Sequence, residues 1–382
     1  MRVLQLSKFF PPVLGGIETV AWELAEGLNR SGVGTDVLCA DQRPRGRRET
    51  LQAAAGARYE VWRSGSFGRL LSTSVAPSMP WTLSALAPRY DIVHVHMPDP
   101  MAAVSVWAAR PRGRLVVHWH SDVIRQRLAL RAYRPLQDWL LARADAVIAT
   151  SEPYARSSEP LARWQHKVHV IPIGISDNHS QACSEKAAAI RRRLRGRRIV
   201  FSLGRMTYYK GFDVLIDAAA ALPDDVVVLV GGEGELLDTY RHRVAERGLA
   251  GKVQLLGHIA DDELPSHFEA CDVFCMPSTV RAEAYGVAIV EAMVMGKPVV
   301  ATDIPGSGVP WVNVHGQTGL NVPVRHPQAL SEALVSLLAD AALRERLGRQ
   351  ARQRYEEQFN SALMTSRVLA MYRALLGRAA AA

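Results

Sequence analysis

The chain has 382 residues, of which 48% are hydrophobic and 22% are charged, and its formal net charge is +9. This composition is typical of a folded globular protein and excludes a mainly disordered chain. Because a single compact core stops growing near about 250 to 300 residues, the length predicts two domains.

No apolar run reaches the roughly 20 residues that a membrane-spanning helix requires. The first residues read as a short strand rather than a signal peptide, so we expect a cytoplasmic protein. The cysteines form no C-x-x-C pair, and buried thiols are therefore expected instead of disulfides or a zinc site. They are Cys39, Cys183, Cys271 and Cys275.

Arginines gather in an expected loop, Arg43–Arg48, and again in Arg191–Arg198. No helix-turn-helix, finger or RNP-type signature accompanies this charge, so nucleic acid is not expected as a partner. An anionic membrane face and a simply solvated surface remain as alternatives. A third basic stretch, Arg125–Arg134, precedes the apolar Trp139 and Leu140. It predicts either a helix attached peripherally to the inner face of the membrane or one that buries its leucines against a sheet.

In the first half, β-rich runs alternate with helical patterns, which predicts parallel strands joined by crossover helices. The first expected strand, Val3–Leu6, leads to Gly15 and Gly16 at the start of a helix. Such glycines let backbone N–H groups approach a diphosphate, although paired glycines also form tight turns. The G-x-G-x-x-G fingerprint is absent, so no nicotinamide cofactor is expected. The other expected strands are Asp36–Cys39, Ile92–His96, Leu115–His118, Ala146–Ala149 and Val168–Ile171.

Histidines occupy alternate positions in His94-Val95-His96 and His118-Trp119-His120. Alternate residues of a strand share a face, so a zinc site is one interpretation. No cysteine or closely spaced third ligand completes a tetrahedral set, and no D-x-D sequence is present. We therefore expect a metal-independent reaction.

The alternation breaks in the polar stretch Gly174–Ser180, the expected linker, and then resumes. We predict an α/β protein with Rossmann-like domains at residues 1–172 and 173–360, whose parallel sheets face one another across a cleft. Residues 361–382 are expected to form a helix that returns to the first domain. The expected strands of the second domain are Ile199–Leu203, Val226–Val230, Val253–Leu256, Val273–Met276 and Val299–Ala301.

Two charged segments of the second half are candidates for chemistry. Arg205 and Lys210 follow an expected strand, where two cations can hold a diphosphate, although a solvated surface is the simpler interpretation. Glu283 and Glu291 lie eight residues apart, around a small-residue turn and an apolar helix. On a continuous helix they would be about 12 Å apart. A largely buried Glu291 needs strong hydrogen-bond partners, and sugar or ribose hydroxyls are suitable.

The segment from Glu283 to Glu291 resembles the E-x7-E motif of the retaining, GT-B-fold glycosyltransferases called family 4. Other pieces follow in the family's order and span almost the whole chain. They are Gly15-Gly16-Ile17-Glu18, His120-Ser121-Asp122, Gly204-Arg205, Lys210-Gly211, Gly231-Gly232-Glu233-Gly234 and Gly296-Lys297-Pro298-Val299-Val300-Ala301. Each piece is weak alone, and the ordered set carries the resemblance.

The resemblance implies roles for the matching residues. Arg205 and Lys210 are expected to bind the diphosphate of the donor, and Glu291 its ribose. Glu283 and His120 are expected to bind the donor sugar, His120 at an outer hydroxyl. Backbone contacts to the donor are expected from Gly15, Gly16, Ala284, Tyr285 and Gly286. The expected catalytic set is His120, Glu283, Arg205 and Lys210. We place Asp122 and His96 near the acceptor, and we expect no cofactor.

Enzymes of that family retain the anomeric configuration, and most lack a placed nucleophile, which implies front-face attack. The segment Gly306–Asn313 is similar to bacterial polysaccharide-assembly members. This similarity favours GDP-mannose over UDP-sugars as the donor, and a glycan or lipid-linked sugar as the acceptor. A GT-B phosphorylase, a nucleotide-sugar epimerase and a non-catalytic nucleotide-sugar-binding subunit are the alternatives.

Overall fold

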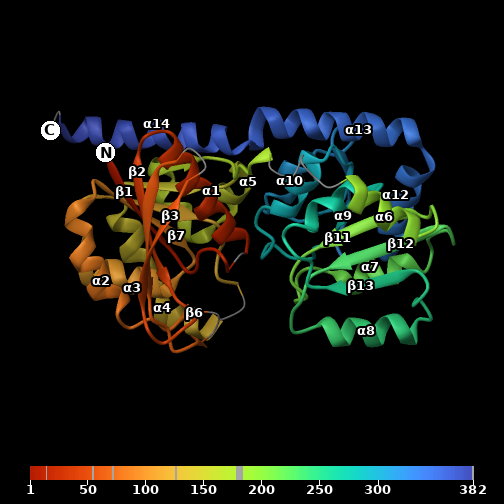
Figure 1. Ribbon diagram of the computed structural model, residues 1–382, viewed down its shortest axis with the longest axis horizontal. Helices are drawn as coiled ribbons and strands as arrows, with labels where there is room; N and C mark the ends of the chain where they lie inside the picture. Colours follow the sequence, from red (N-terminus) through yellow and green to blue (C-terminus); the bar gives the residue numbers. More distant parts are fainter. Residues whose placement is uncertain (14, 54–55, 71–72, 125–126, 178–183, 381–382) are drawn as a thin grey trace. The chain divides into compact units, whose positions relative to one another are not determined.

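The computed structural model describes residues 1–13, 15–53, 56–70, 73–124, 127–177 and 184–380. The chain divides into two compact units, one formed by Met1–Ile175 with Ser361–Ala382, and the other by Ser176–Asn360. Figure 1 shows that each unit contains a sheet with helices packed on it. The predicted α/β class with two Rossmann-like parallel sheets is confirmed.

The first unit contains an eight-stranded sheet in the order β10-β9-β8-β7-β1-β2-β4-β3. Neighbouring strands run parallel except β3 with β4, which are antiparallel. The strands are β1 (Arg2–Ser7), β2 (Gly34–Ala40), β3 (Arg47–Gln52), β4 (Arg58–Ser64), β7 (Ile92–Met97), β8 (Arg114–Trp119), β9 (Ala146–Ala149) and β10 (Val168–Val170), and a separate hairpin joins β5 (Arg69–Leu70) to β6 (Thr73–Ser74). The helices are α1 (Gly16–Arg30), α2 (Met79–Leu86), α3 (Pro100–Ala109), α4 (Arg127–Arg143), α5 (Glu152–Ser157) and α14 (Ser361–Ala380), with 3-10 turns η1 (Ala87–Arg89) and η2 (Glu159–Lys167).

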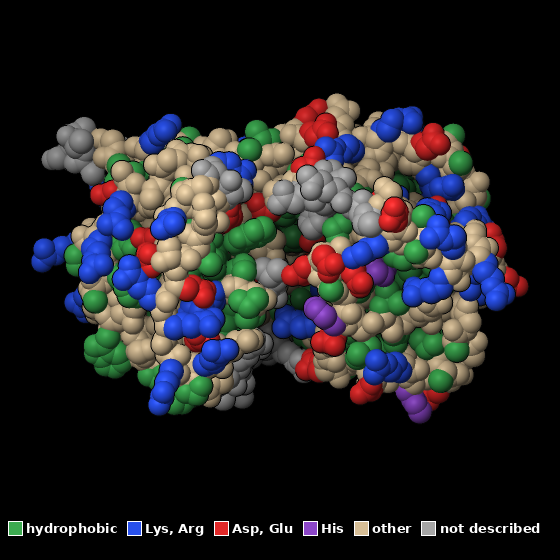
Figure 2. Space-filling model, in the orientation of Figure 1, with side chains coloured by type: hydrophobic (Ala, Val, Ile, Leu, Met, Phe, Trp, Pro, Cys, Tyr) green, Lys and Arg blue, Asp and Glu red, His purple; other side chains and the backbone are tan. Residues whose placement is uncertain are grey.

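The expected arginine loop is partly a strand, because Arg47 and Arg48 lie in β3. The sequence of β3 is almost wholly polar and half-exposed, and it lacks the apolar alternation that predicts strands. Arg48 Nε lies 2.6 Å from Glu60 Oε2, and Arg47 Nε lies 3.1 Å from Asp41 Oδ2. Much of this positive charge is therefore neutralised within the chain. Figure 2 likewise shows basic and acidic side chains interspersed on the face in view.

The C-terminal helix α14 returns to the first unit, as predicted. It packs along α1, where a Cβ added to Gly27 would lie only 2.1 Å from Thr365 Oγ1. The glycine therefore permits the close approach of the two helices. At the start of α14, the Ser361 N–H donates to the Ile175 carbonyl oxygen at 3.0 Å.

Helix α4 uses its apolar side for packing. Leu140 and Leu141 are fully buried, and Leu136 and Trp139 are half-buried. Of the two alternatives that the basic stretch raised, this arrangement favours the helix packed against a sheet; Arg125 itself lies outside the described residues. Among the helices in the described ranges, none combines the length and the apolar character that crossing a bilayer requires.

The second unit contains a six-stranded parallel sheet in the order β13-β12-β11-β14-β15-β16. Its strands are β11 (Arg198–Leu203), β12 (Val226–Gly231), β13 (Val253–Gly257), β14 (Val273–Met276), β15 (Val299–Asp303) and β16 (Gly319–Pro323). Its helices are α6 (Ser184–Arg193), α7 (Phe212–Ala219), α8 (Leu237–Glu246), α9 (Leu264–Ala270), α10 (Val287–Val294), α11 (Val309–Val312), α12 (Pro327–Ala339) and α13 (Ala341–Arg354), followed by a π-helical turn, η4 (Tyr355–Phe359).

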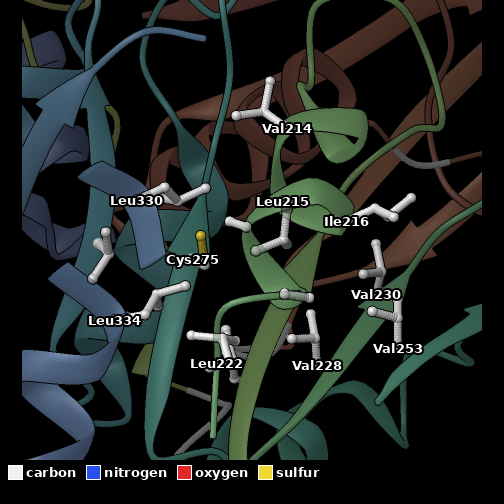
Figure 3. Close-up of a cluster of buried hydrophobic side chains, with 14 of the residues drawn as sticks. Val214, Leu215, Ile216, Leu222, Val228, Val230, Val253, Cys275, Leu330 and Leu334 are labelled. Atoms are coloured by element: carbon white, nitrogen blue, oxygen red, sulfur yellow. The ribbon is translucent and has the colours of Figure 1, made fainter. Parts of the chain in front are cut away.

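The core of the second unit joins helices to one face of this sheet. Figure 3 shows Leu215 of α7 and Leu334 of α12 among Val228, Val230 and other strand residues. These side chains are fully buried, and burying each contributes about 1.5 to 3 kcal/mol. The packed sheet provides a rigid support for the loops at its carboxyl edge.

Cys39, Cys271 and Cys275 are buried free thiols, as expected, and Cys183 lies outside the described residues. Burial raises the pKa of Cys271 to about 12, so this group stays protonated near neutral pH. The expected linker is described as far as Asp177, whose carboxylate binds Arg352 Nη2 at 2.7 Å.

Candidate active site

The sheet of the second unit changes its direction of growth at β11. From β11 the chain builds β12 and β13 toward one edge, and then returns to place β14 on the other side of β11. Loops that leave the carboxyl ends of β11 and β14 diverge at this switch point, where open α/β sheets bind ligands. Lys210 lies in the first of these loops and Glu283 in the second.

Glycines allow the loops at this edge to touch backbone to backbone. Gly211 has φ +68°, and a Cβ there would lie 2.1 Å from the Pro277 carbonyl oxygen after β14. Gly232, in the loop after β12, has φ +126°, and its Cβ would lie 2.0 Å from the Gly204 carbonyl oxygen. Neither position accepts a side chain without movement of the backbone. The glycines thus fix the loops that carry Arg205 and Lys210.

Lys210 and Glu283 form a buried ion pair, with Lys210 Nζ 2.6 Å from Glu283 Oε2. Ser278 Oγ donates a second hydrogen bond to the same oxygen at 3.1 Å. Burial opposes the charge of the lysine, but Glu283 outweighs it and raises the pKa of Lys210 above its ordinary value. Arg205 is exposed on the same loop, and its charge acts in the opposite direction. Lys210 and Glu283, which are both expected to bind the donor, therefore form an ion pair with each other in the free protein.

Glu291 is half-buried on α10, and its partial removal from water raises the pKa of its carboxyl to about 7. The charge of Lys210 acts against this rise, and that of Asp261 adds to it. Three charged groups expected at the donor, Lys210, Glu283 and Glu291, thus interact within this unit.

Glu283 and Glu291 do not share a continuous helix, so the expected helical spacing between them is wrong. Glu283 lies in a turn, and α10 begins only at Val287. Gly286 precedes the helix with φ +88°, a conformation that favours glycine and breaks the helical path. The Gly308 N–H donates to the Ala284 carbonyl oxygen at 2.8 Å, which ties this turn to the segment Gly306–Asn313. Tyr285 is buried, and its ring contacts those of Trp311 and Phe359.

The first unit has a matching switch point between β1 and β7. The loop after β1 ends at Gly15 and Gly16, which are exposed where α1 begins. The first amides of any helix lack carbonyl partners inside the helix, and the helix terminus carries partial positive charge. Gly15 is extended at φ −170°, so backbone conformation alone does not require glycine there.

The four histidines lie together on one face of this sheet, inside the first unit. His94, His96 and His118 offer ring nitrogens within 4.8 Å of one another, which raises the question of a metal. However, these ring nitrogens already have partners. His94 Nε2 lies 3.2 Å from His118 Nδ1, and His96 binds Gln5 and His120 through its two ring nitrogens. This geometry favours a hydrogen-bonded stack, and metal independence stays a prediction.

His96 is 1% exposed, and both of its ring nitrogens bind protein groups, Gln5 and His120. This arrangement favours a supporting role over direct acceptor binding. Asp122 is half-buried, and its Oδ1 accepts hydrogen bonds from Trp119 Nε1 at 2.9 Å and Ser158 Oγ at 2.6 Å. Its carboxylate is thus anchored beside the end of β8.

Asp99 is a polar group at this edge that the sequence patterns did not indicate. It caps α3 through a hydrogen bond from the Met101 N–H at 3.0 Å, and it is only 1% exposed. Burial raises its pKa to about 6, and the charge of Lys8 opposes that rise. The pattern Asp-Pro after a strand was the available signal, because it is typical of a helix cap.

Two family models together match most of the chain. One is described as a glycosyl transferase 4-like domain and covers residues 15–174, and the other as glycosyl transferases group 1 and covers residues 185–354. O-antigen chain mannosyltransferase C of Escherichia coli is 32% identical, over 98% of this chain and 99% of its own. D-rhamnosyltransferase WbpZ of Pseudomonas aeruginosa is 31% identical, over 94% of this chain and 93% of its own.

Solved structures with little sequence identity share the fold. Sucrose-phosphate synthase from Thermosynechococcus elongatus matches with a TM-score of 0.80 at 22% identity, over 99% of both chains. Anabaena Alr3699/HepE, in complex with UDP and glucose, matches with a TM-score of 0.77 at 22% identity, over 98% of this chain and 100% of its own. With the family models and the relatives that align along its whole length, this chain belongs to the GT-B glycosyltransferases of the family 4 type.

Proposed function

We propose that this glycosyltransferase moves a mannosyl residue from GDP-mannose to a glycan or lipid-linked acceptor in bacterial surface polysaccharide assembly, with retention at the anomeric carbon and without a metal. The observation that carries the proposal is the buried Lys210–Glu283 pair at the switch point. Glu291 lies close enough to this pair for the charge of Lys210 to lower its pKa. A cation and two carboxylates match the three parts of a nucleotide sugar.

Each group has one part of the donor to bind. Lys210 and the exposed Arg205 bind the diphosphate, and the backbone from Ala284 to Gly286 approaches it at the start of α10. Glu291 accepts hydrogen bonds from the ribose, and Glu283 accepts them from sugar hydroxyls. His120 accepts one from the outer hydroxyl of the sugar. Gly15 and Gly16 let the first amides of α1 bind a phosphate of the donor.

The chemical step is a front-face substitution. The acceptor oxygen forms a bond to the anomeric carbon while the bond to the β-phosphate oxygen breaks on the same face. The acceptor proton passes to the departing phosphate oxygen, so no separate base is required. Arg205 and Lys210 stabilise the charge that develops on the diphosphate. Asp122 lies on the acceptor side.

GDP-mannose is favoured because several relatives are named mannosyltransferases, one of them GDP-mannose-dependent. The relative named for D-rhamnose uses a 6-deoxy sugar. His120 Nδ1 is buried, and no described residue of the chain forms a hydrogen bond with it. A hexose with its outer hydroxyl intact satisfies that nitrogen, whereas a 6-deoxy sugar leaves it unpaired. UDP-sugars are the alternative, since the structural neighbour with the same fold binds UDP.

An anionic lipid surface is the proposed partner of the first unit, through α2 and α3, which pack together. Trp81 is 73% exposed on α2, Trp107 is 49% exposed on α3, and Phe67 is 72% exposed before the β5–β6 hairpin. The stretches 61–90 and 100–121 contain no acidic residue. Exposed aromatic rings among arginines are typical of proteins that rest on anionic headgroups. The exposed arginines here are Arg89, Arg110 and Arg112.

The test is turnover with a panel of GDP- and UDP-sugars and a lipid-linked glycan acceptor. The proposal expects GDP release together with mannosyl transfer, and an α-linked product from the α-linked donor. Turnover with UDP-sugars alone would contradict the donor assignment. Phosphate-dependent release of sugar 1-phosphate would favour the phosphorylase alternative instead, and binding without any turnover would favour the non-catalytic subunit.

A further inference from the structure

A chain of three buried side chains connects the middle of the first sheet to His120. Gln5 lies on β1, His96 on β7 and His120 just beyond β8, and these strands are neighbours. The backbone N–H of His120 continues the hydrogen bonding between β7 and β8 by donating to the Met97 carbonyl oxygen at 2.9 Å. The exposed fractions of Gln5, His96 and His120 are 0%, 1% and 5%. Water therefore does not compete for the hydrogen bonds among them.

The hydrogen bonds of this chain determine where its protons lie. With Gln5 Oε1 directed at His96, 2.7 Å from its Nε2, His96 Nε2 carries the proton, because an amide oxygen only accepts. In this orientation the buried Gln5 Nε2 has no hydrogen-bond partner among the described residues. A neutral imidazole carries one proton, which leaves His96 Nδ1 as an acceptor. His96 Nδ1 is 2.9 Å from His120 Nε2, so His120 Nε2 must donate. His120 Nδ1 therefore carries a free lone pair.

Both rings are neutral in this environment. Burial lowers the pKa of His96 and of His120 well below the ordinary value, and the neighbouring His118 lowers both further. His120 Nδ1 is itself buried and has no hydrogen-bond partner among the residues that the structure describes. A buried acceptor without a partner costs about 1 to 3 kcal/mol. A ligand that offers a hydroxyl at this position would recover it.

We propose that Gln5 is a positioning residue that acts through His96 and fixes the tautomer of His120, so that His120 Nδ1 accepts a hydrogen bond from a sugar hydroxyl. The identity of that hydroxyl rests on the proposed function, but the tautomer does not. The tautomer of His120 depends on the orientation of the Gln5 amide. If Gln5 Nε2 faced His96 instead of Oε1, the Gln5–His96 and His96–His120 hydrogen bonds would both reverse direction, and His120 Nδ1 would be a donor.

The experiment measures the tautomer directly, by ¹⁵N NMR of the protein labelled at its histidine rings. Protonated and unprotonated ring nitrogens have well-separated shifts, and the His120 signals are assigned by their loss in His120→Ala. The wild type is compared with Gln5→Met, which keeps the length of the side chain and removes its acceptor. Steady-state transfer from GDP-mannose is measured on the same samples.

Two variants serve as matched controls. Gln137→Met makes the same change at a glutamine on α4 that is 2% exposed. Tyr372→Phe removes the hydroxyl that binds His94 Nδ1, and so disturbs the same histidine stack outside the Gln5–His96–His120 chain. Both controls should leave the tautomer of His120 unchanged.

The expected wild-type result is an unprotonated Nδ1 and a protonated Nε2 on His120. Gln5→Met should give a mixture of tautomers and lower kcat about tenfold, the loss of one hydrogen bond, with less effect on KM. A protonated Nδ1 in the wild type would overturn the proposal even if Gln5→Met did not fold, and so would a single unchanged tautomer in Gln5→Met. A shifted tautomer with unchanged turnover would instead contradict the role of His120 in the proposed function.

Discussion

Lys210 Nζ lies 2.6 Å from Glu283 Oε2, and the two side chains are only 13% and 11% exposed. Each charge is therefore compensated by the other in the free protein. On the proposed function, the donor replaces this pair, because its diphosphate binds Lys210 while its sugar hydroxyls donate to Glu283. The ion pair keeps both groups charged and in place before the donor arrives.

The first prediction is strong coupling between these two residues. Lys210→Met leaves Glu283 buried without its cation, and Glu283→Gln leaves the cation without its carboxylate, so each should cost about 3 kcal/mol. The double variant holds neither charge. It should be more stable than the sum of the two single losses predicts, by about 2 kcal/mol. Urea unfolding of the four proteins measures this coupling.

The control compares the wild type, the two single variants and the double variant at the exposed pair Arg241–Asp238 of the same unit, where the side chains are 56% and 92% exposed. Arg241→Met and Asp238→Asn should couple by less than about 0.5 kcal/mol. Equal coupling at the two pairs would mean that the Lys210–Glu283 contact is no stronger than a surface ion pair.

The second prediction concerns pH. Burial raises the pKa of Glu291 to about 7 in the folded protein, from an ordinary value of 4.5. The folded protein therefore binds a proton that the unfolded chain has released, and the stability from this group falls as pH rises through that interval. Above pH 7 Glu291→Gln should be more stable than the wild type, by on the order of 1 to 3 kcal/mol.

This advantage should vanish in acid, where Glu291 is protonated in both states. Thermal unfolding across the pH range measures it, with Glu332→Gln on the exposed side of α12 as the matched control. A pH-independent difference between Glu291→Gln and the wild type would show that the carboxyl is not protonated in the free protein.

The third prediction is that His120→Ala lowers turnover more than donor affinity. His120 orients the reacting sugar in the proposed mechanism and does not hold the nucleotide. Steady-state kinetics with GDP-mannose should show a fall in kcat of about tenfold or more, with KM changed less. An increase confined to KM would place His120 in ground-state binding.

The fourth prediction concerns the lipid surface. Sedimentation with anionic vesicles should fall when Trp81 and Trp107 are both changed to Ser, and binding by the wild type should weaken with added salt. Trp164→Ser is the control, since that ring is half-buried beneath Lys167 Nζ, 4.4 Å away. Equal losses in both proteins, or wild-type binding that ignores lipid charge, would exclude α2 and α3 as the contact.

The sequence patterns predicted both parallel sheets, because buried strands are apolar runs that recur between helical segments. All the strands that they indicated are present, within two residues at each end. The patterns missed β3, β4, β16 and the β5–β6 hairpin. Charged residues interrupt β3 and β4, β5 and β6 have two residues each, and β16 is a short strand of mixed exposure at the sheet edge. Edge strands lack the two buried faces that produce a continuous apolar run.

The candidate site was predictable in its members but not in its contacts. Resemblance to the family pointed to Lys210 and Glu283, yet their pairing depends on β11 and β14 being neighbours, which no local pattern reveals. Likewise, the distance from Glu283 to Glu291 depends on Gly286, whose positive φ delays the start of α10. Gln5 carried no signal at all, since a glutamine in an apolar strand is not distinctive until its partner is known.

Calorimetric binding of GDP and of GDP-mannose to Glu291→Ala and Glu283→Ala examines the donor site itself. Ribose binding by Glu291 predicts that Glu291→Ala weakens both ligands equally, by on the order of 1.5 to 3 kcal/mol. Glu283→Ala should weaken GDP-mannose only, and GDP should bind it at least as well as the wild type, because Lys210 is then released for the diphosphate. Unchanged GDP binding by a folded Glu291→Ala protein would contradict the assignment of this site to a nucleotide sugar.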